Sequence, residues 1–139
     1  MIRYGIVGIG GFAATWVRCL EELEREGIAR LAAAVVRRPD HYRERVERLR
    51  AAGCAIYPDL ETMLAAGRDS LDVIGVPTGI AHHEPMATRA MEAGYNVLIE
   101  KPVAGTVQEV RRLQEVERRT GRWCAVGYQW LHSPTARWI

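Results

Sequence analysis

The sequence contains very little lysine and no concentration of charge of either sign. Of its 139 residues only Lys101 is a lysine, although lysine and arginine together number 19. The formal net charge is +2 at pH 7, and the arginines are spread along several segments without an aromatic-rich stripe. A nucleic-acid-binding surface needs a concentrated basic patch. We therefore expect no nucleic-acid partner, and the single lysine stands out among the candidate functional residues.

Cysteine pairs and long apolar runs are also missing. The three cysteines, Cys19, Cys54 and Cys124, are odd in number, widely spaced and never arranged as Cys-x-x-Cys. This pattern argues against a disulfide framework and against a zinc site, so we expect no metal. The sequence opens without the features of a secretory signal and has no apolar run long enough to span a bilayer. We therefore expect a cytoplasmic protein without a membrane partner.

Short apolar runs alternate with amphipathic stretches along the whole sequence. The apolar runs predict strands at residues 2–7, 30–36, 55–57, 71–76, 96–99 and 123–127. The amphipathic stretches predict helices at residues 12–26, 39–52, 60–67, 83–93 and 106–120. Strands and helices that alternate through short links predict an α/β fold, with a doubly wound parallel sheet and helices on both of its faces.

A glycine-rich turn joins the first predicted strand to the first predicted helix. It runs Gly8-Ile9-Gly10-Gly11-Phe12-Ala13 and matches the pattern Gly-x-Gly-x-x-Gly/Ala. Gly8 allows a tight turn, Gly10 lets a pyrophosphate approach the backbone, and Ala13 lets the helix pack closely on the strand. The helix start, with Gly11 and Phe12, presents free N–H groups that favour an anion. The turn predicts a dinucleotide-binding βαβ unit; a glycine-rich turn without a ligand is the alternative.

The second predicted strand ends in two arginines, where a carboxylate would favour NAD. That carboxylate ordinarily bonds the ribose 2′-hydroxyl. Here Arg37 and Arg38 follow the strand, and the first acidic residue after the end of the strand is Asp40. Guanidinium groups bind phosphate in a fork geometry, so this pair suits the 2′-phosphate of NADP. We predict NAD or NADP as cofactor, with a preference for NADP; arginines that only face solvent are the alternative.

Several further motifs follow one another along the sequence in a fixed order. After the glycine turn come the strand end Val76-Pro77-Thr78, the pair His82-His83, the block from Ala93 to Pro102, and Gly127-Tyr128 ahead of Pro134. The block is the most specific, because it ends Val-Leu-Ile-Glu-Lys-Pro. Together these motifs resemble the Gfo/Idh/MocA oxidoreductases over essentially the whole chain.

The resemblance implies a Rossmann NAD(P)-binding domain over residues 1–122. Residues 123–139 would then form its last strand and the start of a crossover into a second, α+β substrate domain that is absent from this chain. The activity implied is NAD(P)-dependent hydride transfer to or from a sugar, polyol or related small metabolite, in a protein that can form homo-oligomers. The alternative is a stand-alone cofactor-binding module, or an inactive fragment, without catalysis of its own.

The resemblance also implies roles for residues beside the cofactor. Lys101 would be the catalytic residue at the nicotinamide, where its ammonium stabilises a developing alkoxide or takes part in proton transfer. Glu100 and Pro102 would fix the loop that carries it. The remaining cofactor-binding residues implied by the resemblance are Val76, Pro77, Thr78, His82, His83, Tyr128 and Gln129. Of the two histidines, His83 matches the helix-start histidine of the family better; a structural role for the pair is the alternative.

Overall fold

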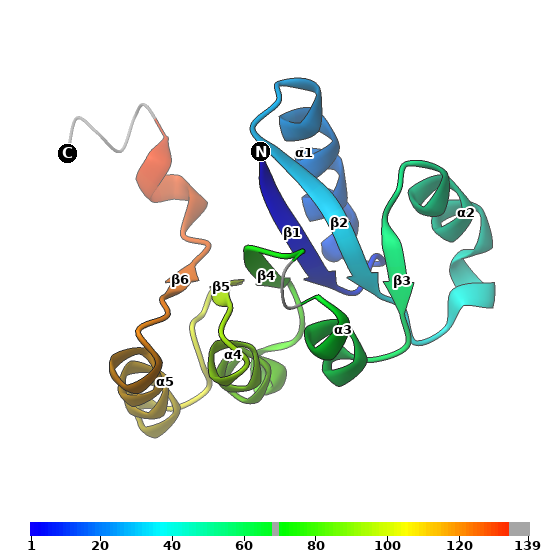
Figure 1. The fold of residues 1–139 in the computed structure, drawn as a ribbon. Helices are drawn as coiled ribbons and strands as arrows, with labels where there is room; N and C mark the ends of the chain where they lie inside the picture. The colour runs from blue at the N-terminus through cyan, green and yellow to red at the C-terminus, as the bar shows by residue number, and fades with distance from the viewer. Residues whose placement is uncertain (68–69, 134–139) are drawn as a thin grey trace.

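Six strands form one sheet in the computed structural model, which describes residues 1–67 and 70–133. All neighbouring strands are parallel, and their order is β3-β2-β1-β4-β5-β6 (Figure 1). The strands are Ile2–Val7 (β1), Ala29–Val35 (β2), Ala55–Tyr57 (β3), Val73–Val76 (β4), Asn96–Ile99 (β5) and Cys124–Val126 (β6). The strand order changes direction between β1 and β4, which is where doubly wound sheets bind their ligands. The predicted fold class is confirmed.

Within the described residues, five α-helices and three short 3-10 turns connect these strands. The α-helices are Ala13–Arg25 (α1), Arg43–Ala51 (α2), Leu60–Ala66 (α3), His83–Glu92 (α4) and Val107–Thr120 (α5). The 3-10 turns are Pro39–Tyr42, Ile80–His82 and Gln129–His132. Most of the predicted boundaries lie within one residue of those observed. The end of the chain after Ser133, where Pro134 and Ile139 fall, lies outside the described residues.

Two predicted elements are corrected by the structure. The single helix expected at residues 39–52 is divided, because Tyr42 has non-helical backbone angles (φ −120°, ψ 29°) and α2 begins only at Arg43. The strand expected at residues 71–76 begins at Val73, because the Leu71 N–H instead bonds the Gly67 carbonyl in the turn after α3. The first correction has a consequence for the site, since it places the Tyr42 ring beside the glycine turn.

Each face of the sheet has its own hydrophobic core. α1 and α2 cover one face, and α3, α4 and α5 cover the other (Figure 1). The pairing of β1 with β2 shifts after Tyr4: Tyr4 pairs with Leu31, but Gly5 pairs with Ala33, so Ala32 is an extra residue. Leu31 and Ala34 therefore lie in the same core, although three positions separate them. This irregularity lets the apolar run of β2 serve both cores.

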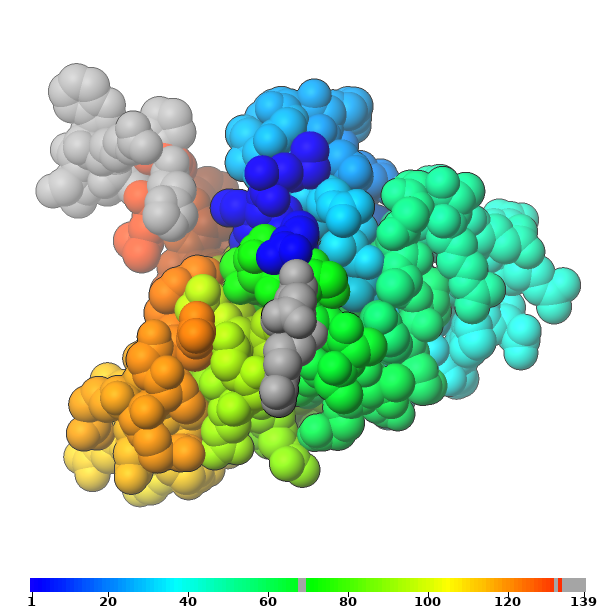
Figure 2. Space-filling view, in the orientation of Figure 1, coloured from blue at the N-terminus to red at the C-terminus, as the bar shows by residue number. Residues whose placement is uncertain are grey.

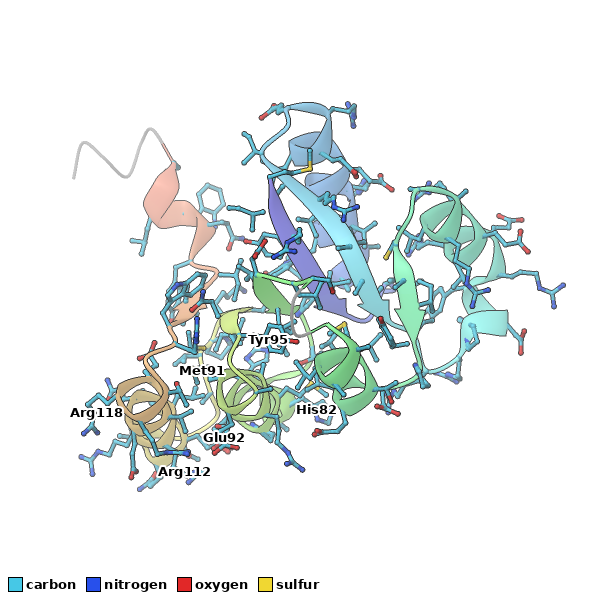
Figure 3. All side chains as sticks on the ribbon, in the orientation of Figure 1. His82, Met91, Glu92, Tyr95, Arg112 and Arg118 are labelled. Atoms are coloured by element: carbon cyan, nitrogen blue, oxygen red, sulfur yellow. The ribbon has the colours of Figure 1, made fainter. Side chains whose placement is uncertain are left out.

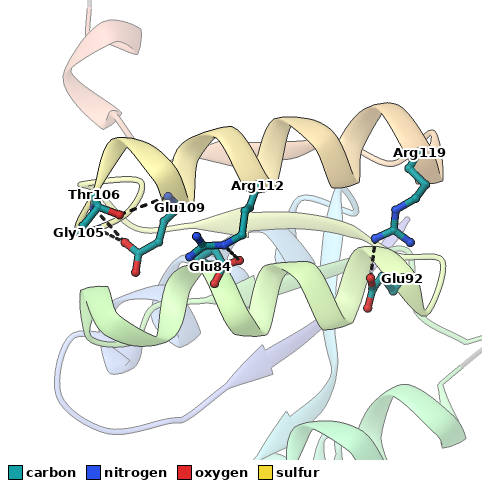
Figure 4. Close-up of polar contacts among 7 residues, drawn as sticks. All are labelled: Glu84, Glu92, Gly105, Thr106, Glu109, Arg112 and Arg119. Atoms are coloured by element: carbon teal, nitrogen blue, oxygen red, sulfur yellow. Dashed lines mark hydrogen bonds and ion pairs between the residues drawn. The ribbon is translucent and has the colours of Figure 1, made fainter.

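Helix α5 lies along α4 and is joined to it by two ion pairs (Figure 4). Arg112 contacts Glu84 at 3.0 Å, and Arg119 contacts Glu92 at 2.6 Å. Both arginines and Glu92 are more than a third exposed, so each pair contributes at most about 1 kcal/mol. Thr106 and Glu109 form a capping box at the start of α5, with its hydrogen bonds in both directions. α5 is thus held in register just before the chain enters β6.

β3 and β6 are the two edge strands of the sheet. Figure 2 shows the β3 edge, with α2 beside it, on the side of the molecule away from the β6 edge. Between the two ends, Tyr95 is buried and donates its hydroxyl hydrogen to the Leu64 carbonyl of α3 at 2.7 Å (Figure 3). This bond joins the start of β5 to α3, across the core that α3, α4 and α5 cover. Among the helices that the structure describes, none is both long and apolar enough to cross a membrane.

Candidate cofactor-binding site

A cleft of about 410 Å³ lies at the carboxyl ends of β1, β2 and β4. Its walls come from the glycine turn, from the turn after β2 and from the segments that follow β3 and β4. The sequence-predicted residues that line it are Gly8, Gly10, Ala13, Arg37, Arg38, Pro77, Thr78 and His82. Gly11 and Phe12 complete the turn at the start of α1 but do not line the cleft. The structure therefore brings the glycine turn, the two arginines after β2 and the residues between β4 and α4 to one cleft.

Gly8 has the turn conformation that the motif requires, and Gly10 has no room for a side chain. Gly8 has a φ of +92°, which L side chains rarely adopt, and its N–H donates to the Val35 carbonyl at 3.0 Å. Gly10 lies so close to Tyr42 that a Cβ on the glycine would be 2.5 Å from the ring Cζ. The first turn of α1 contains no acidic residue, and no side chain of the described residues caps it. The N–H groups of Ala14 and Thr15 donate to the carbonyls of Gly11 and Phe12, so the N–H groups that precede them in the turn are the ones left for an anion.

Tyr42 lines the cleft and Arg45 contacts the glycine turn from α2, although sequence reasoning assigned neither residue to the site. Arg45, in the first turn of α2, donates a hydrogen bond from Nη1 to the carbonyl of Ile9 within the glycine turn. Tyr42 lines the cleft together with the exposed pair Arg37 and Arg38. Nothing in the sequence separates Arg45 from the other arginines of α2. Tyr42 falls on the apolar stripe of a predicted helix, which indicates the core rather than a cleft.

The opposite wall carries polar groups that suit a polar ligand. The Oγ1 atom of Thr78 is buried and has no hydrogen-bond partner among the described residues. A buried hydroxyl without a partner is costly unless a ligand or water satisfies it. Asp59 also lines the cleft; its carboxylate accepts the Thr62 N–H at 2.7 Å, and this hydrogen bond lowers the pKa of the carboxyl. The unsatisfied hydroxyl fits a polar ligand such as a dinucleotide, whereas the space beside Gly10 is filled by the Tyr42 ring.

Lys101 lies in a second hollow, of about 390 Å³, between the ends of β5 and β6. The hollow is lined by Lys101, Tyr128, Gln129, Trp130 and Leu131. The side chain of Lys101 is exposed, and its backbone N–H donates to Glu100 Oε2 at 3.1 Å. The bond between Lys101 and Pro102 is cis. Tyr128 and Gln129, both expected at the nicotinamide end of the cofactor, are therefore grouped with the lysine rather than with the glycine turn.

The two adjacent histidines have different surroundings. His82, which is labelled in Figure 3, lines the cleft directly before α4. His83 is only 1% exposed, with Nδ1 at 2.9 Å from the Pro102 carbonyl oxygen and Nε2 at 3.0 Å from the Thr78 carbonyl oxygen. Val76, also predicted as a cofactor contact, is buried in the core. A role for His83 or Val76 must therefore act through the residues around them.

The strand order, the glycine turn and the open start of α1 define a Rossmann-type dinucleotide-binding domain. Residues 2–128 match the family described as an oxidoreductase family with an NAD-binding Rossmann fold. The chain therefore belongs to the Gfo/Idh/MocA family, as its motifs predict.

Among curated proteins, the chain is similar to a dTDP-3,4-didehydro-2,6-dideoxy-alpha-D-glucose 3-reductase of Actinomadura kijaniata. The two are 32% identical over 138 residues, which cover 99% of this chain and 40% of the reductase. An alpha-N-acetylgalactosaminidase of Shewanella oneidensis is 31% identical over 129 residues, which cover 89% of this chain and 28% of that enzyme. The chain thus spans well under half the length of the curated relatives that it matches.

Solved structures show the same relation. KijD10, a 3-ketoreductase from Actinomadura kijaniata in complex with NADP and TDP-benzene, superposes with a TM-score of 0.82 at 31% identity, over 99% of this chain and 40% of KijD10. The WlbA dehydrogenase from Bordetella pertussis, in complex with NADH and UDP-GlcNAcA, gives a TM-score of 0.83 at 23% identity, over 99% and 40% of the two chains. The second likeness supports the fold alone.

Proposed function

We propose that this chain forms the cofactor-binding part of an NAD(P)-dependent oxidoreductase that acts on a sugar, polyol or related small metabolite. One observation carries the proposal: the glycine-turn cleft and the single lysine lie at the same carboxyl edge of one parallel sheet. The relatives support a sugar substrate, because one is named as a reductase of a dTDP-linked sugar and KijD10 holds NADP together with TDP-benzene.

The residues of the cleft divide the cofactor among them. The pyrophosphate would lie on the glycine turn, against Gly8, Gly10 and the first N–H groups of α1. Arg37 and Arg38 would contact the 2′-phosphate of NADP, since they lie where the second strand ends. The unpartnered hydroxyl of Thr78 would bond a polar group of the cofactor on the opposite wall.

Lys101 would act on the oxygen atom of the reacting carbon. A bound nicotinamide supplies or accepts the hydride. In carbonyl reduction, the ammonium stabilises the negative charge that develops on the oxygen and donates the proton that completes the alcohol. In alcohol oxidation, neutral Nζ takes the hydroxyl proton. The exposed position of Lys101 in its own hollow leaves space for such a substrate.

A cofactor titration tests this function directly. We expect the chain to bind NADPH about tenfold or more tightly than NADH, measured by nicotinamide fluorescence, because charge-assisted hydrogen bonds reach the 2′-phosphate. Replacing both Arg37 and Arg38 by glutamine should remove this difference and leave NADH binding unchanged. Arg43→Gln, at an exposed arginine of α2, is the matched control. Tighter binding of NADH would contradict the NADP preference, and binding of neither cofactor would contradict the function.

A second candidate function is a glycosidase that uses the same cofactor transiently. The galactosaminidase relative favours it, at an identity similar to that of the reductase. Such an enzyme returns its cofactor to the starting state in every cycle. An enzyme containing this chain would therefore release N-acetylgalactosamine without a net change in nicotinamide absorbance, whereas an oxidoreductase changes the absorbance in proportion to product.

Self-association is a further part of the proposal. Large apolar side chains near β6 are exposed, and they are Trp123 (46%), Tyr128 (44%), Trp130 (77%) and Leu131 (68%). An apolar surface of this kind favours contact with another molecule or domain. We expect concentration-dependent association in sedimentation experiments, and a clean monomer would contradict this part alone. A location in the cytoplasm is likewise proposed, from the sequence.

A further inference from the structure

The peptide segment that carries Lys101 is held from both faces of the sheet. Its neighbours along the chain, Glu100 and Pro102, are each hydrogen-bonded to a side chain of a distant helix. We propose that these two side chains, Trp16 of α1 and His83 of α4, are positioning residues that fix the direction of Lys101. What Lys101 does in hydride transfer rests on the function proposed above, but the fixation of its backbone does not.

Trp16 reaches Glu100 from the face that α1 covers. The indole Nε1–H donates to Glu100 Oε1 at 2.9 Å, and Glu100 Oε2 accepts the backbone N–H of Lys101 at 3.1 Å. The indole crosses β4 at Gly75, where a Cβ would lie 3.0 Å from the ring Cζ3. Glycine at this position therefore leaves the space that the indole needs. One carboxylate is thus shared between α1 and Lys101.

His83 acts from the face that α4 covers. Its buried imidazole lies 2.9 Å from the carbonyl oxygen of Pro102 and 3.0 Å from that of Thr78. Thr78 belongs to the turn after β4 and lines the cofactor cleft. A neutral imidazole carries one N–H and donates to only one of these carbonyls, so the positioning role of His83 requires the Nδ1–H tautomer, which donates to Pro102. Removing the imidazole would leave the Pro102 carbonyl without this donor, which is costly in a buried site.

Fixing the backbone is the means available to direct this lysine. Lysine carries its charge on a flexible four-carbon stem, and the side chain of Lys101 is exposed. Burial therefore does not restrict where its ammonium points. The direction in which the stem leaves the backbone depends on the peptide units of Glu100 and Pro102. Those units are the ones that Trp16 and His83 hold.

The single lysine of the sequence makes a direct test possible. Isotopically labelled lysine gives one backbone amide resonance for the whole chain, that of Lys101. Trp16→Phe keeps an aromatic ring but removes the indole N–H. We expect this variant to raise the exchange rate of the Lys101 amide about tenfold and to shift its resonance. Trp123→Phe, at an exposed tryptophan, is the matched control and should change neither.

Two substitutions at His83 separate its two contacts. The amide nitrogen of asparagine takes the place of Nδ1, whereas that of glutamine takes the place of Nε2. His83→Asn therefore keeps a donor for Pro102, and His83→Gln keeps a donor for Thr78. We expect His83→Asn to retain the wild-type exchange rate of the Lys101 amide and His83→Gln to raise it about tenfold. A purely structural role for His83 would affect both variants alike, and thermal unfolding identifies a variant that does not fold.

The two halves of the proposal fail separately. Wild-type exchange in folded Trp16→Phe would overturn the role of Trp16, and equal exchange in the two His83 variants would overturn the role of His83. If neither His83 variant folds, the exchange rate of the Lys101 amide in Trp16→Phe decides whether side chains of distant helices fix the Lys101 segment. Titration of the same samples with NADPH keeps the proposed function distinct, because a wild-type chain that binds no dinucleotide would contradict the function and leave the Lys101 comparison valid.

Discussion

The glycine turn and the segment around Lys101 lie at the same edge of the sheet, yet they are held by different means. The turn is set mainly by backbone groups, through the positive φ of Gly8 and the hydrogen bond from its N–H to the Val35 carbonyl, with one side-chain hydrogen bond from Arg45 to Ile9. The Lys101 segment is set by the side chains of Trp16 and His83, which come from helices on opposite faces. A turn held by its backbone fails when a Cβ is added to it. A segment held by side chains fails when one of them is removed.

The largest expected effect belongs to the lysine itself. In an enzyme that contains this chain and a substrate-binding domain, Lys101→Ala should lower kcat by about 10²- to 10⁴-fold, because proton transfer and stabilisation of the oxyanion are both lost. The dissociation constant for NADPH should stay nearly unchanged, since the glycine turn does not depend on the lysine. Steady-state kinetics and nicotinamide fluorescence measure the two quantities. Unchanged turnover would remove the catalytic assignment.

The next effect belongs to Gly10. Gly10→Ala places a Cβ in overlap with the Tyr42 ring, so the ring or the glycine turn must shift, and in the proposed binding mode the pyrophosphate lies on that turn. We expect NADPH affinity to fall about tenfold, a penalty of the size that added methyl groups cause in packed sites. Gly79→Ala is the matched control, because Gly79 lines the same cleft with a φ of −69° and with open space around its missing Cβ. Equal losses in both variants would contradict a specific role for Gly10.

The difference between the two regions also explains what could be predicted from the sequence. Six consecutive residues, Gly8 to Ala13, determine the turn, so a local motif is enough to predict it. Lys101 was assigned through the family resemblance, but the residues that hold it were not. Trp16 and Glu100 are 84 positions apart, and only the order of strands in the sheet brings them together. No local pattern carries that information.

Tyr42 and Arg45 were missed for related reasons. The sequence predicts one helix over residues 39–52, and in that helix Tyr42 would face the core. The structure packs the Tyr42 ring against that core and also brings it beside Gly10 in the cleft, and this second contact is the one that the helix prediction did not contain. The fold itself was predicted almost completely, because it depends on the alternation of apolar and amphipathic stretches and on glycine and proline at their ends. Side-chain contacts between distant elements are the part that needs coordinates.

Arg45 offers a smaller test on the glycine-turn side. Across a trans peptide the carbonyl and the following N–H point in opposite directions. By holding the carbonyl of Ile9, Arg45 therefore directs the N–H of Gly10 to the other side. Arg45→Gln should weaken NADPH binding about five- to tenfold, in line with the loss of a charged hydrogen bond. Arg43→Gln, on the exposed side of the same helix, should not, and an equal effect in both variants would indicate a general charge effect.

The smallest effect is expected at the opposite edge of the sheet, which belongs to neither region. Arg3 of β1 contacts Asp72 before β4 at 2.7 Å, and this side-chain hydrogen bond lowers the pKa of Asp72 to about 2. A carboxyl whose pKa is lowered by folding stabilises the native state above its unfolded pKa of about 4, and this contribution is lost as the pH falls through about 2. Both side chains are more than a third exposed, at 36% and 40%. The contribution is therefore about 1 kcal/mol.

Asp72→Asn should accordingly lower the free energy of unfolding by about 1 kcal/mol at pH 7, and the difference from wild type should shrink between about pH 4 and pH 2. Urea unfolding at a series of pH values measures this. NADPH binding at pH 7 should not change, because the ion pair lies at the amino ends of the strands and the cleft at their carboxyl ends. If Asp72→Asn weakened NADPH binding as much as Gly10→Ala does, the two edges would be coupled. The conformation of the glycine turn would then depend on an ion pair at the opposite edge of the sheet.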